Sequence, residues 1–281
     1  MEHDQGRRMK TSRVSLLICT LAICACTAQE SIHIPDPRLK TAIEDELWVW
    51  NPTPADMLGL TSLDLSARKI KDLTGLEYAK NLQTLRLTHN QVEDLSPLSP
   101  LTNLRTLVPN NNKIKELSPL SGLTDLRVIN SHENQIVDVT PLAGLQNLEF
   151  LDLHENQVRS LSALSGLHKL EHLDLNRNQI KDLYPLSGLH KLAYLNLSFN
   201  QISNLSALSG LDNLSTLCLY NNQIKDISTL SGLTNLWVLR VHNNPLGQQV
   251  CDIYVAQIIA NNPGILEFSY DLCANQSPLA D

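Results

Sequence analysis

Histidine and aspartate residues recur in the middle of this 281-residue chain, and such side chains could bind a metal ion or move protons. His132 and His154 are separated by 22 residues, Asp152 and Asp174 by the same interval, and His172 lies two residues before Asp174. Imidazole and carboxylate groups are suitable ligands for transition metals. The sequence shows no nucleophile paired with a base, no phosphate-binding loop and no CxxC pair. These residues therefore favour binding over covalent catalysis.

Aromatic residues follow the same spacing beside these polar groups. Exposed aromatic side chains on a rigid surface contribute much of the energy of protein interfaces. The alternative is that they only cover the structure beneath them. We take as the candidate binding surface the following residues: Phe150, Asp152, His154, His172, Asp174, Tyr194, Phe199 and Tyr220.

An asparagine that recurs every 22 residues indicates which kind of fold holds these side chains in place. It occupies positions Asn90, Asn112, Asn134, Asn156, Asn178, Asn200, Asn222 and Asn244. A side-chain amide repeated at one depth of a stacked chain can bond backbone groups of its own turn and of the next. The chain is therefore predicted to be a solenoid, in which each unit continues the last.

One repeat, residues 148–169, shows the role of each position. Leu151 and Leu153 are two residues apart and point inward from a strand, so the residues beside them point outward. Three more leucines are spaced by three and fit a tight 3-10 turn: Leu161, Leu164 and Leu167. Because helical turns are wider than strands, the stack should curve with a parallel sheet on its concave side. The outward side chains of the strands would form the concave face.

These repeats resemble the leucine-rich repeat family, specifically its 22-residue bacterial, internalin-like class. Residues 60–246 carry the motif Leu-x-x-Leu-x-Leu-x-x-Asn-x-Ile/Val-x-x-Leu-x-x-Leu-x-x-Leu and the recurring Ser-Pro/Ala-Leu-Ser-Gly-Leu. The resemblance implies an α/β solenoid: a right-handed superhelix with a concave parallel β-sheet and short 3-10 turns on the convex side. It also implies a non-enzymatic protein that binds another protein at the cell surface.

We expect four regions along the chain. They are a signal peptide at residues 1–28, a helical N-terminal cap at 29–59, the repeats at 60–246 and a mixed C-terminal cap at 247–281. In the first cap, Asp36 is a good N-cap residue and Pro37 suits the first helical position. Beyond the last repeat, we expect a helix over 250–260 and a strand over 264–270, which would cover the open edge of the sheet.

The first region has the pattern of an export signal. Basic residues precede an apolar run at 14–28, which is too short for an ordinary membrane span. Two cleavage interpretations stay open: residues 23–26 resemble a bacterial lipobox, which would place a lipid on Cys26, whereas 26–28 have the small residues that ordinary signal peptidase requires. In both cases we expect a secreted or cell-envelope protein. A lipid on Cys26, in the first case, would be its only contact with the membrane.

Cysteine positions agree with export. Cys251 and Cys273 both follow the last full repeat, where a cap must be held in place. An oxidising compartment would allow them to form a disulfide bond, and the alternative is two buried free thiols. Cys218 would then have no partner.

Two residues depart from the repeat pattern. The inward strand position that is leucine in most repeats is Pro109 in one repeat and Ser131 in the next. Proline cannot donate to a strand ladder, and a serine there faces the core. The two interpretations are one tolerated weak layer and a local bulge or hinge that shapes the concave face.

Composition narrows the class of partner. The formal net charge is -7 and no cluster of Lys and Arg appears, so nucleic acid is not expected. Side chains that project in parallel from a sheet do not converge in a pocket, so we expect no cofactor, no metal and no enzymatic activity. The sequence thus predicts a monomeric binder of a protein. The alternatives are a structural scaffold of the envelope and a carbohydrate-binding module that uses Tyr194, Tyr220 and the aspartates.

Overall fold

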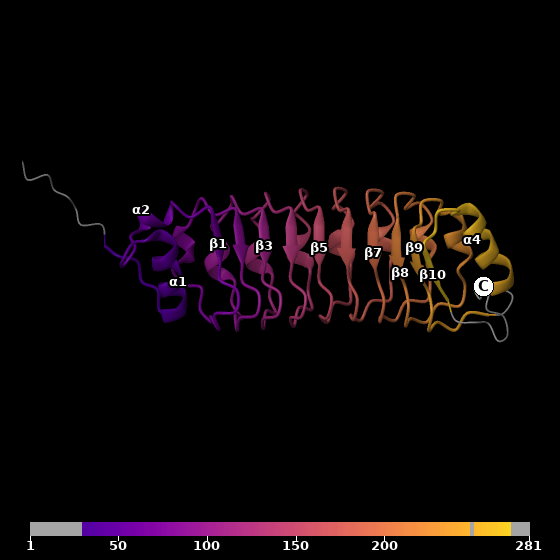
Figure 1. Ribbon diagram of the computed structural model, residues 1–281, viewed down its shortest axis with the longest axis horizontal. Coiled ribbons are helices and arrows are strands. Elements are labelled where there is room, and N and C mark those ends of the chain that lie inside the picture. The colour runs from indigo at the N-terminus through magenta and orange to yellow at the C-terminus, as the bar shows by residue number, and fades with distance from the viewer. Residues whose placement is uncertain (1–29, 248–249, 271–281) are drawn as a thin grey trace, which may run out of the picture. The chain divides into compact units, whose positions relative to one another are not determined.

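Three-residue strands stack in sequence order into one open parallel sheet of ten strands. The computed structural model describes residues 30–247 and 250–270, and Figure 1 shows the strands side by side along the row of coils. The strands are β1 Ser62–Asp64, β2 Thr84–Arg86, β3 Thr106–Val108, β4 Val128–Asn130, β5 Phe150–Asp152, β6 His172–Asp174, β7 Tyr194–Asn196, β8 Thr216–Cys218, β9 Val238–Arg240 and β10 Glu267–Ser269. We call the outward side of these strands the sheet face.

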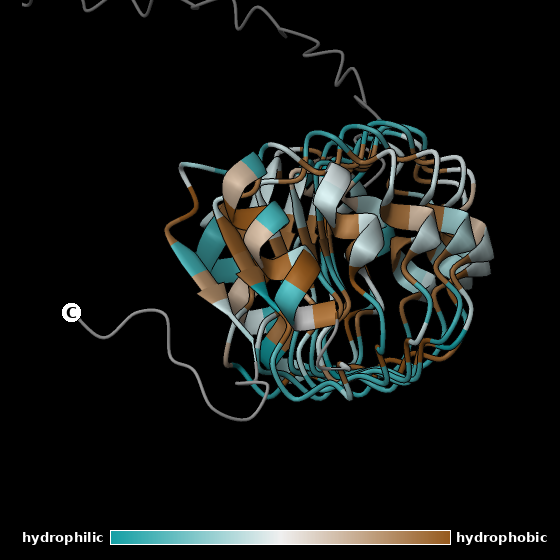
Figure 2. Cartoon of the chain, turned by 90° about the vertical axis from the view of Figure 1, so that its right-hand side faces the viewer, coloured by the Kyte–Doolittle hydropathy of each residue, from teal (hydrophilic) through white to brown (hydrophobic). Residues whose placement is uncertain are grey.

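Short 3-10 turns follow the strands and lie across the core from them. They are η1 Leu76–Tyr78, η2 Ser96–Leu98, η3 Ser118–Leu120, η4 Thr140–Leu142, η5 Ser162–Leu164, η6 Tyr184–Leu186, η7 Ser206–Leu208 and η8 Ser228–Gly232. Figure 2 shows the coils along their row, with apolar and polar residues alternating along the backbone. The predicted fold class, a leucine-rich repeat solenoid with a parallel sheet and 3-10 turns, is confirmed.

The core is one continuous layer of aliphatic side chains that runs through every coil. In the repeat at 148–169, each of the apolar positions is at most 1% exposed: Leu148, Leu151, Leu153, Val158, Leu161, Leu164 and Leu167. Burial of one such side chain contributes about 1.5–3 kcal/mol before the entropy of ordering is subtracted. A coil keeps this burial only if the coils on both sides cover it, so the stack folds as a unit.

The asparagine column forms the predicted ladder, with one difference in direction. Asn156 Oδ1 accepts from the Ile136 amide at 2.9 Å, and its Nδ2 donates to the carbonyls of Ser131 at 3.1 Å and Leu153 at 3.0 Å. Leu153 belongs to the same coil, whereas Ile136 and Ser131 belong to the preceding coil and not to the next one. The same three bonds recur at all the ladder asparagines.

Two short helices cover the first coil. Helix α1 spans Pro37–Leu47 and begins at the predicted N-cap Asp36, whose Oδ1 accepts from the Arg38 amide at 2.9 Å. Helix α2 spans Pro54–Met57. The second oxygen of Asp36 accepts from the Lys71 amide of the first coil at 2.8 Å, a contact that the sequence did not predict. One carboxylate therefore both caps the helix and joins it to the repeats.

The last coil is covered by a helix and a final strand, as the sequence predicts. A π-helical segment, η9 Cys251–Val255, continues into α4 Ala256–Asn261, and β10 pairs in parallel with β9. Buried Asn262 accepts from the Leu236 amide and donates to the carbonyls of Leu233 and Ile258. This asparagine, which lies outside the 22-residue spacing, connects the cap to the last coil much as the ladder asparagines connect coils.

The predicted signal peptide, Cys26 and Cys273 lie outside the described residues, so the lipid and the Cys251–Cys273 disulfide stay predictions. Within the described part of the chain, no helix is long and apolar enough to cross a membrane. Cys218 is buried as a free thiol.

The two irregular residues weaken one layer without shifting the strands. Proline 109 has no N–H, and β3 and β4 pair through two residues where their neighbours pair through three. The backbone hydrogen bonds between these two coils resume at the Asn111 amide, which donates to the His132 carbonyl at 2.9 Å. The Ser131 hydroxyl is fully buried without a hydrogen-bond partner. Since the register continues on both sides, the arrangement is a weak layer and not a bulge.

Asn156→Ala tests the ladder. The substitution leaves the Ile136 amide without its partner, and it removes one of the two asparagine donors from each of the Ser131 and Leu153 carbonyls. A buried polar group without a partner costs about 1–3 kcal/mol. We expect the free energy of unfolding, measured by chemical denaturation, to fall by about 1–3 kcal/mol. Asn103→Ala is the matched control, because Asn103 is exposed and makes one bond to the Lys80 carbonyl. Equal effects of the two substitutions would contradict the role of the ladder.

Ser131→Ala tests the weak layer. It removes a buried hydroxyl that lacks a partner, so we expect the free energy of unfolding to rise by about 1 kcal/mol. Ser118→Ala, at an exposed position, should change it by less than about 0.5 kcal/mol. A loss of stability in the Ser131 variant would show that its hydroxyl is bonded in solution.

Candidate functional site

The strand register brings the predicted columns together on the sheet face. Phe150 of β5 is opposite His172 of β6, which is opposite Tyr194 of β7. The third residues of the same strands are also aligned, so Asp152 is opposite Asp174. A row of rings therefore runs beside a row of polar side chains on the three central strands.

The three rings of the first row form one stack. The centroids of Phe150 and His172 are 4.1 Å apart with an interplanar angle of 11°, and those of His172 and Tyr194 are 4.1 Å apart with an angle of 6°. All three residues are partly buried, whereas the sequence predicted exposed aromatics. Neighbouring rings cover one another's faces, so the stack offers ring edges and only its two outermost faces.

Phe199 and Tyr220 belong to a separate group of rings. They meet edge to face with centroids 5.3 Å apart, and Tyr220 stacks on His242 at 4.7 Å. Phe199 lies in the left-handed corner that precedes the ladder asparagine, with φ of 54°, and the Arg177 guanidinium lies 4.4 Å from its ring centroid. No ring contact among the described residues joins this group to the Phe150 stack. The structure thus divides the candidate surface that the sequence treated as one.

The acidic residues make several hydrogen bonds next to the stack. Asp152 is 8% exposed, and its Oδ1 accepts from the Nδ1 of His154 at 2.7 Å and from the His154 amide at 3.0 Å. Asp174 Oδ2 accepts from Asn196 Nδ2 at 3.0 Å and from the Tyr194 hydroxyl at 3.3 Å. These bonds fix the side chains that border the rings.

Burial and neighbouring charge shift several pKa values at this site. Burial raises the pKa of Asp174, and the negative charge of Asp152 adds to the shift. The hydrogen bond that His154 donates to Asp152 raises the pKa of His154 against the opposing effect of burial. Burial lowers the pKa of His172, and burial beside Asp174 raises the pKa of the Tyr194 hydroxyl. Hence His154 gains a proton more readily than His172 does.

Four residues outside the predicted surface take part in these contacts, and one of them is His242, which stacks on Tyr220. His132 stacks on His154 with centroids 4.1 Å apart, and its Nε2 lies 2.7 Å from Asn110 Nδ2. Asn196 and Arg177 also contact the predicted residues, as described above. The 22-residue spacing could have found His132 and Asn196, which share columns with His154 and Asp174. It could not have shown that Arg177 lies over Phe199.

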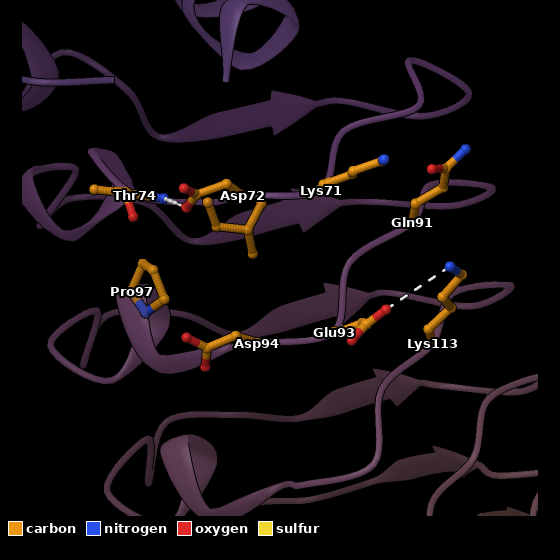
Figure 3. Close-up of a pocket in the computed structure, with 9 residues that line it drawn as sticks. Lys71, Asp72, Thr74, Gln91, Glu93, Asp94, Pro97 and Lys113 are labelled. Atoms are coloured by element: carbon orange, nitrogen blue, oxygen red, sulfur yellow. Dashed lines mark hydrogen bonds and ion pairs between the residues drawn. The ribbon is translucent and has the colours of Figure 1, made fainter. Parts of the chain in front are cut away.

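An open cavity of about 460 Å³ lies away from these residues, beside the segments of the first coils that lead into the turns η1 and η2. Figure 3 shows that its wall carries both signs of charge. Glu93 pairs with Lys113 at 3.7 Å, and Asp72 accepts from the Thr74 amide at 2.8 Å. Because these groups neutralise or bond one another, the cavity has no set of polar groups directed at a ligand. The sheet face remains the candidate site.

Two family models match the chain. The model described as "Leucine Rich repeats (2 copies)" matches residues 80–122, 168–210 and 212–251, and the model described as "Leucine rich repeat" matches residues 132–180. No curated protein matches the chain in a sequence search.

Solved structures are similar to most of the chain. Internalin C2 from Listeria monocytogenes is 37% identical, with 74% of this chain and 93% of that chain covered and a TM-score of 0.68. A leucine-rich repeat protein of Leptospira interrogans, LIC12759, shares the fold at 23% identity, with 77% and 62% covered and a TM-score of 0.67. The plant peptide hormone receptor RGFR1, solved in complex with RGF2, is 25% identical, with 60% and 29% covered and a TM-score of 0.55.

Proposed function

The chain belongs to the internalin-like class of leucine-rich repeat proteins, and on this premise we propose that it is an exported, non-enzymatic protein that binds a protein partner through its sheet face. Proteins of this class are in general binding proteins, and the fold suggests protein–protein interaction. The plant receptor with the same fold was solved with its peptide RGF2 bound. The partner of this chain is a protein presented at the cell surface.

The stack of Phe150, His172 and Tyr194 carries the proposal. Its rings come from three adjacent strands that are each paired on both sides, so the positions of the rings are fixed before a partner arrives. Binding then costs little ordering of these three side chains, which is the advantage of a preformed site. Partly buried aromatic side chains on a rigid support are typical anchors of protein interfaces.

The second row of side chains adds charge to this surface. Asp152 and Asp174 follow the ring-bearing residues by two positions on the same strands, so they border the stack. The complementary partner surface is apolar at its centre and carries a basic or hydrogen-bond-donating group at its edge.

The ring geometry favours a protein partner over a carbohydrate. A sugar ring packs on the open face of an aromatic ring, but His172 has both faces covered, and His172 covers one face each of Phe150 and Tyr194. Tyr220, the other tyrosine of the carbohydrate interpretation, stacks on His242. Ring edges with bordering carboxylates suit the side chains of a protein better than the flat face of a sugar.

The remaining features complete the proposal. Residues 1–28 direct export, after which either signal peptidase removes them or Cys26 receives a lipid. Residues 29–59 and 247–281 cap the repeats at 60–246. Cys251 forms a disulfide bond with Cys273 in the oxidising compartment. The mature chain is a monomer, secreted or attached to the cell envelope.

A parallel screen separates the three functional classes. The purified mature protein is applied to an array of extracellular proteins and to a glycan array, and binding is read by fluorescence. We expect saturable binding to a protein and none to glycans. Binding to glycans alone would support the carbohydrate interpretation, and binding to neither would support an envelope scaffold.

Phe150→Ala and Tyr194→Ala test the ring stack on the partner found in that screen. We expect each substitution to weaken binding by about 1 kcal/mol or more, a roughly fivefold rise in Kd, because each removes an outer ring of the stack. Thr106→Ala changes the same strand position outside the stack and should leave Kd unchanged. Circular dichroism and thermal melting check that the fold is kept. If both ring variants bind as the unmodified protein does, the stack is not the binding centre.

A further inference from the structure

Two aspartates and a histidine converge at the centre of the sheet face. Asp152 and Asp174 are partners in the register of β5 and β6, and His154 Nδ1 lies 2.7 Å from Asp152 Oδ1. One donor atom from each of the three residues lies within 4.8 Å of the other two. From the sequence we expected side chains that project from neighbouring strands to stay apart. In the structure, these three donor atoms lie close together.

Within the part of the chain that the structure describes, neither carboxylate forms an ion pair with Lys or Arg. Among the described residues, every ion pair of a Lys or Arg goes to a glutamate. Asp152 is buried, and like charges opposite each other on adjacent strands repel. The sheet thus holds two carboxylates together at a cost that a bound cation would offset.

The distances between these donor atoms suit a small metal ion. Nitrogen and oxygen ligands lie about 2.0–2.2 Å from Zn²⁺, so two ligands of one tetrahedral ion are roughly 3–3.5 Å apart. The separations of 2.7 Å to at most 4.8 Å bracket this value, and small side-chain rotations would reach it. We propose that Asp152, His154 and Asp174 bind a divalent transition-metal ion of the Zn²⁺ type.

The ligand set also indicates which ions fit. Ca²⁺ takes six to eight oxygen ligands and Mg²⁺ demands near-ideal octahedral oxygen coordination, whereas imidazole with carboxylate suits Zn²⁺ and similar ions. Three protein ligands leave a coordination position on the open side of the sheet. Water or an acidic group of another protein can occupy it. The ion binds whether or not the protein partner proposed above exists.

A neighbouring group provides an internal control. His132, Glu133 and His154 also place donor atoms within 4.8 Å of one another, and this group shares His154 with the proposed site. It carries only one carboxylate, that of exposed Glu133, whereas the proposed site carries two. The proposed site has two negative charges in a more enclosed position and is the better cation site.

Titration calorimetry with ZnCl₂ tests the proposal on purified protein that has been stripped with a chelator. We expect one ion per chain, and a loss of affinity of at least about tenfold in Asp174→Asn and in His154→Gln. Glu133→Gln should bind as the unmodified protein does. No saturable Zn²⁺ binding, equal binding in Asp174→Asn, or a loss in Glu133→Gln alone would each overturn the proposed site. None of these results bears on the protein partner, whose binding is measured separately with the chelator present.

Two further measurements distinguish loss of the metal site from misfolding of a variant, and the proposed ligands from cysteine ligands. Zn²⁺ should raise the melting temperature of the unmodified protein and of Glu133→Gln but not that of Asp174→Asn, since an ion that binds only the folded state stabilises it. Co²⁺ in place of Zn²⁺ should give absorption bands of nitrogen and oxygen ligands without a thiolate charge-transfer band. A thiolate band would assign the ion to a cysteine and contradict the proposal.

Discussion

The hydrogen bonds of one buried amide per coil are the interaction on which the rest of this structure depends. Each ladder asparagine accepts from one backbone amide and donates to two backbone carbonyls, and these groups belong to two successive coils. Buried backbone groups need hydrogen-bond partners, and at this corner the ladder asparagines provide them. Any change of repeat length would move the amide away from them, so the ladder explains why the 22-residue period is kept while surface residues vary.

Regular coils fix the sheet, and the sheet fixes the candidate site. Parallel strands lie about 4.7–4.9 Å apart, and aromatic residues at the same position of adjacent strands therefore stack, as Phe150, His172 and Tyr194 do at 4.1 Å. The same spacing places Asp152 beside Asp174. Neither contact needs a cavity or a special loop. The chemistry of the surface follows from which residue types share a column.

The period made most of the fold predictable from the sequence. The strands, turns, capping helix and final strand all follow from spacing, whereas Asn262 and the second bond of Asp36 could not be found because each occurs once, outside the repeat. The columns of the site were predictable for the same reason. Their packing was not, because the burial of a ring depends on its neighbours' side chains, and the separation of Phe199 from the stack depends on its left-handed corner.

Hydrogen exchange tests the ladder most directly, because it reports on single amides in the intact protein. The amides bonded by the asparagine side chains are those of Ile70, Val92, Ile114, Ile136, Val158, Ile180, Ile202 and Ile224. They lie outside the strands, where backbone amides of loops exchange fast. We predict that they are protected as strongly as the strand amides and through the global unfolding reaction. Exchange at the rate of exposed loop amides would contradict a ladder that holds the coils together.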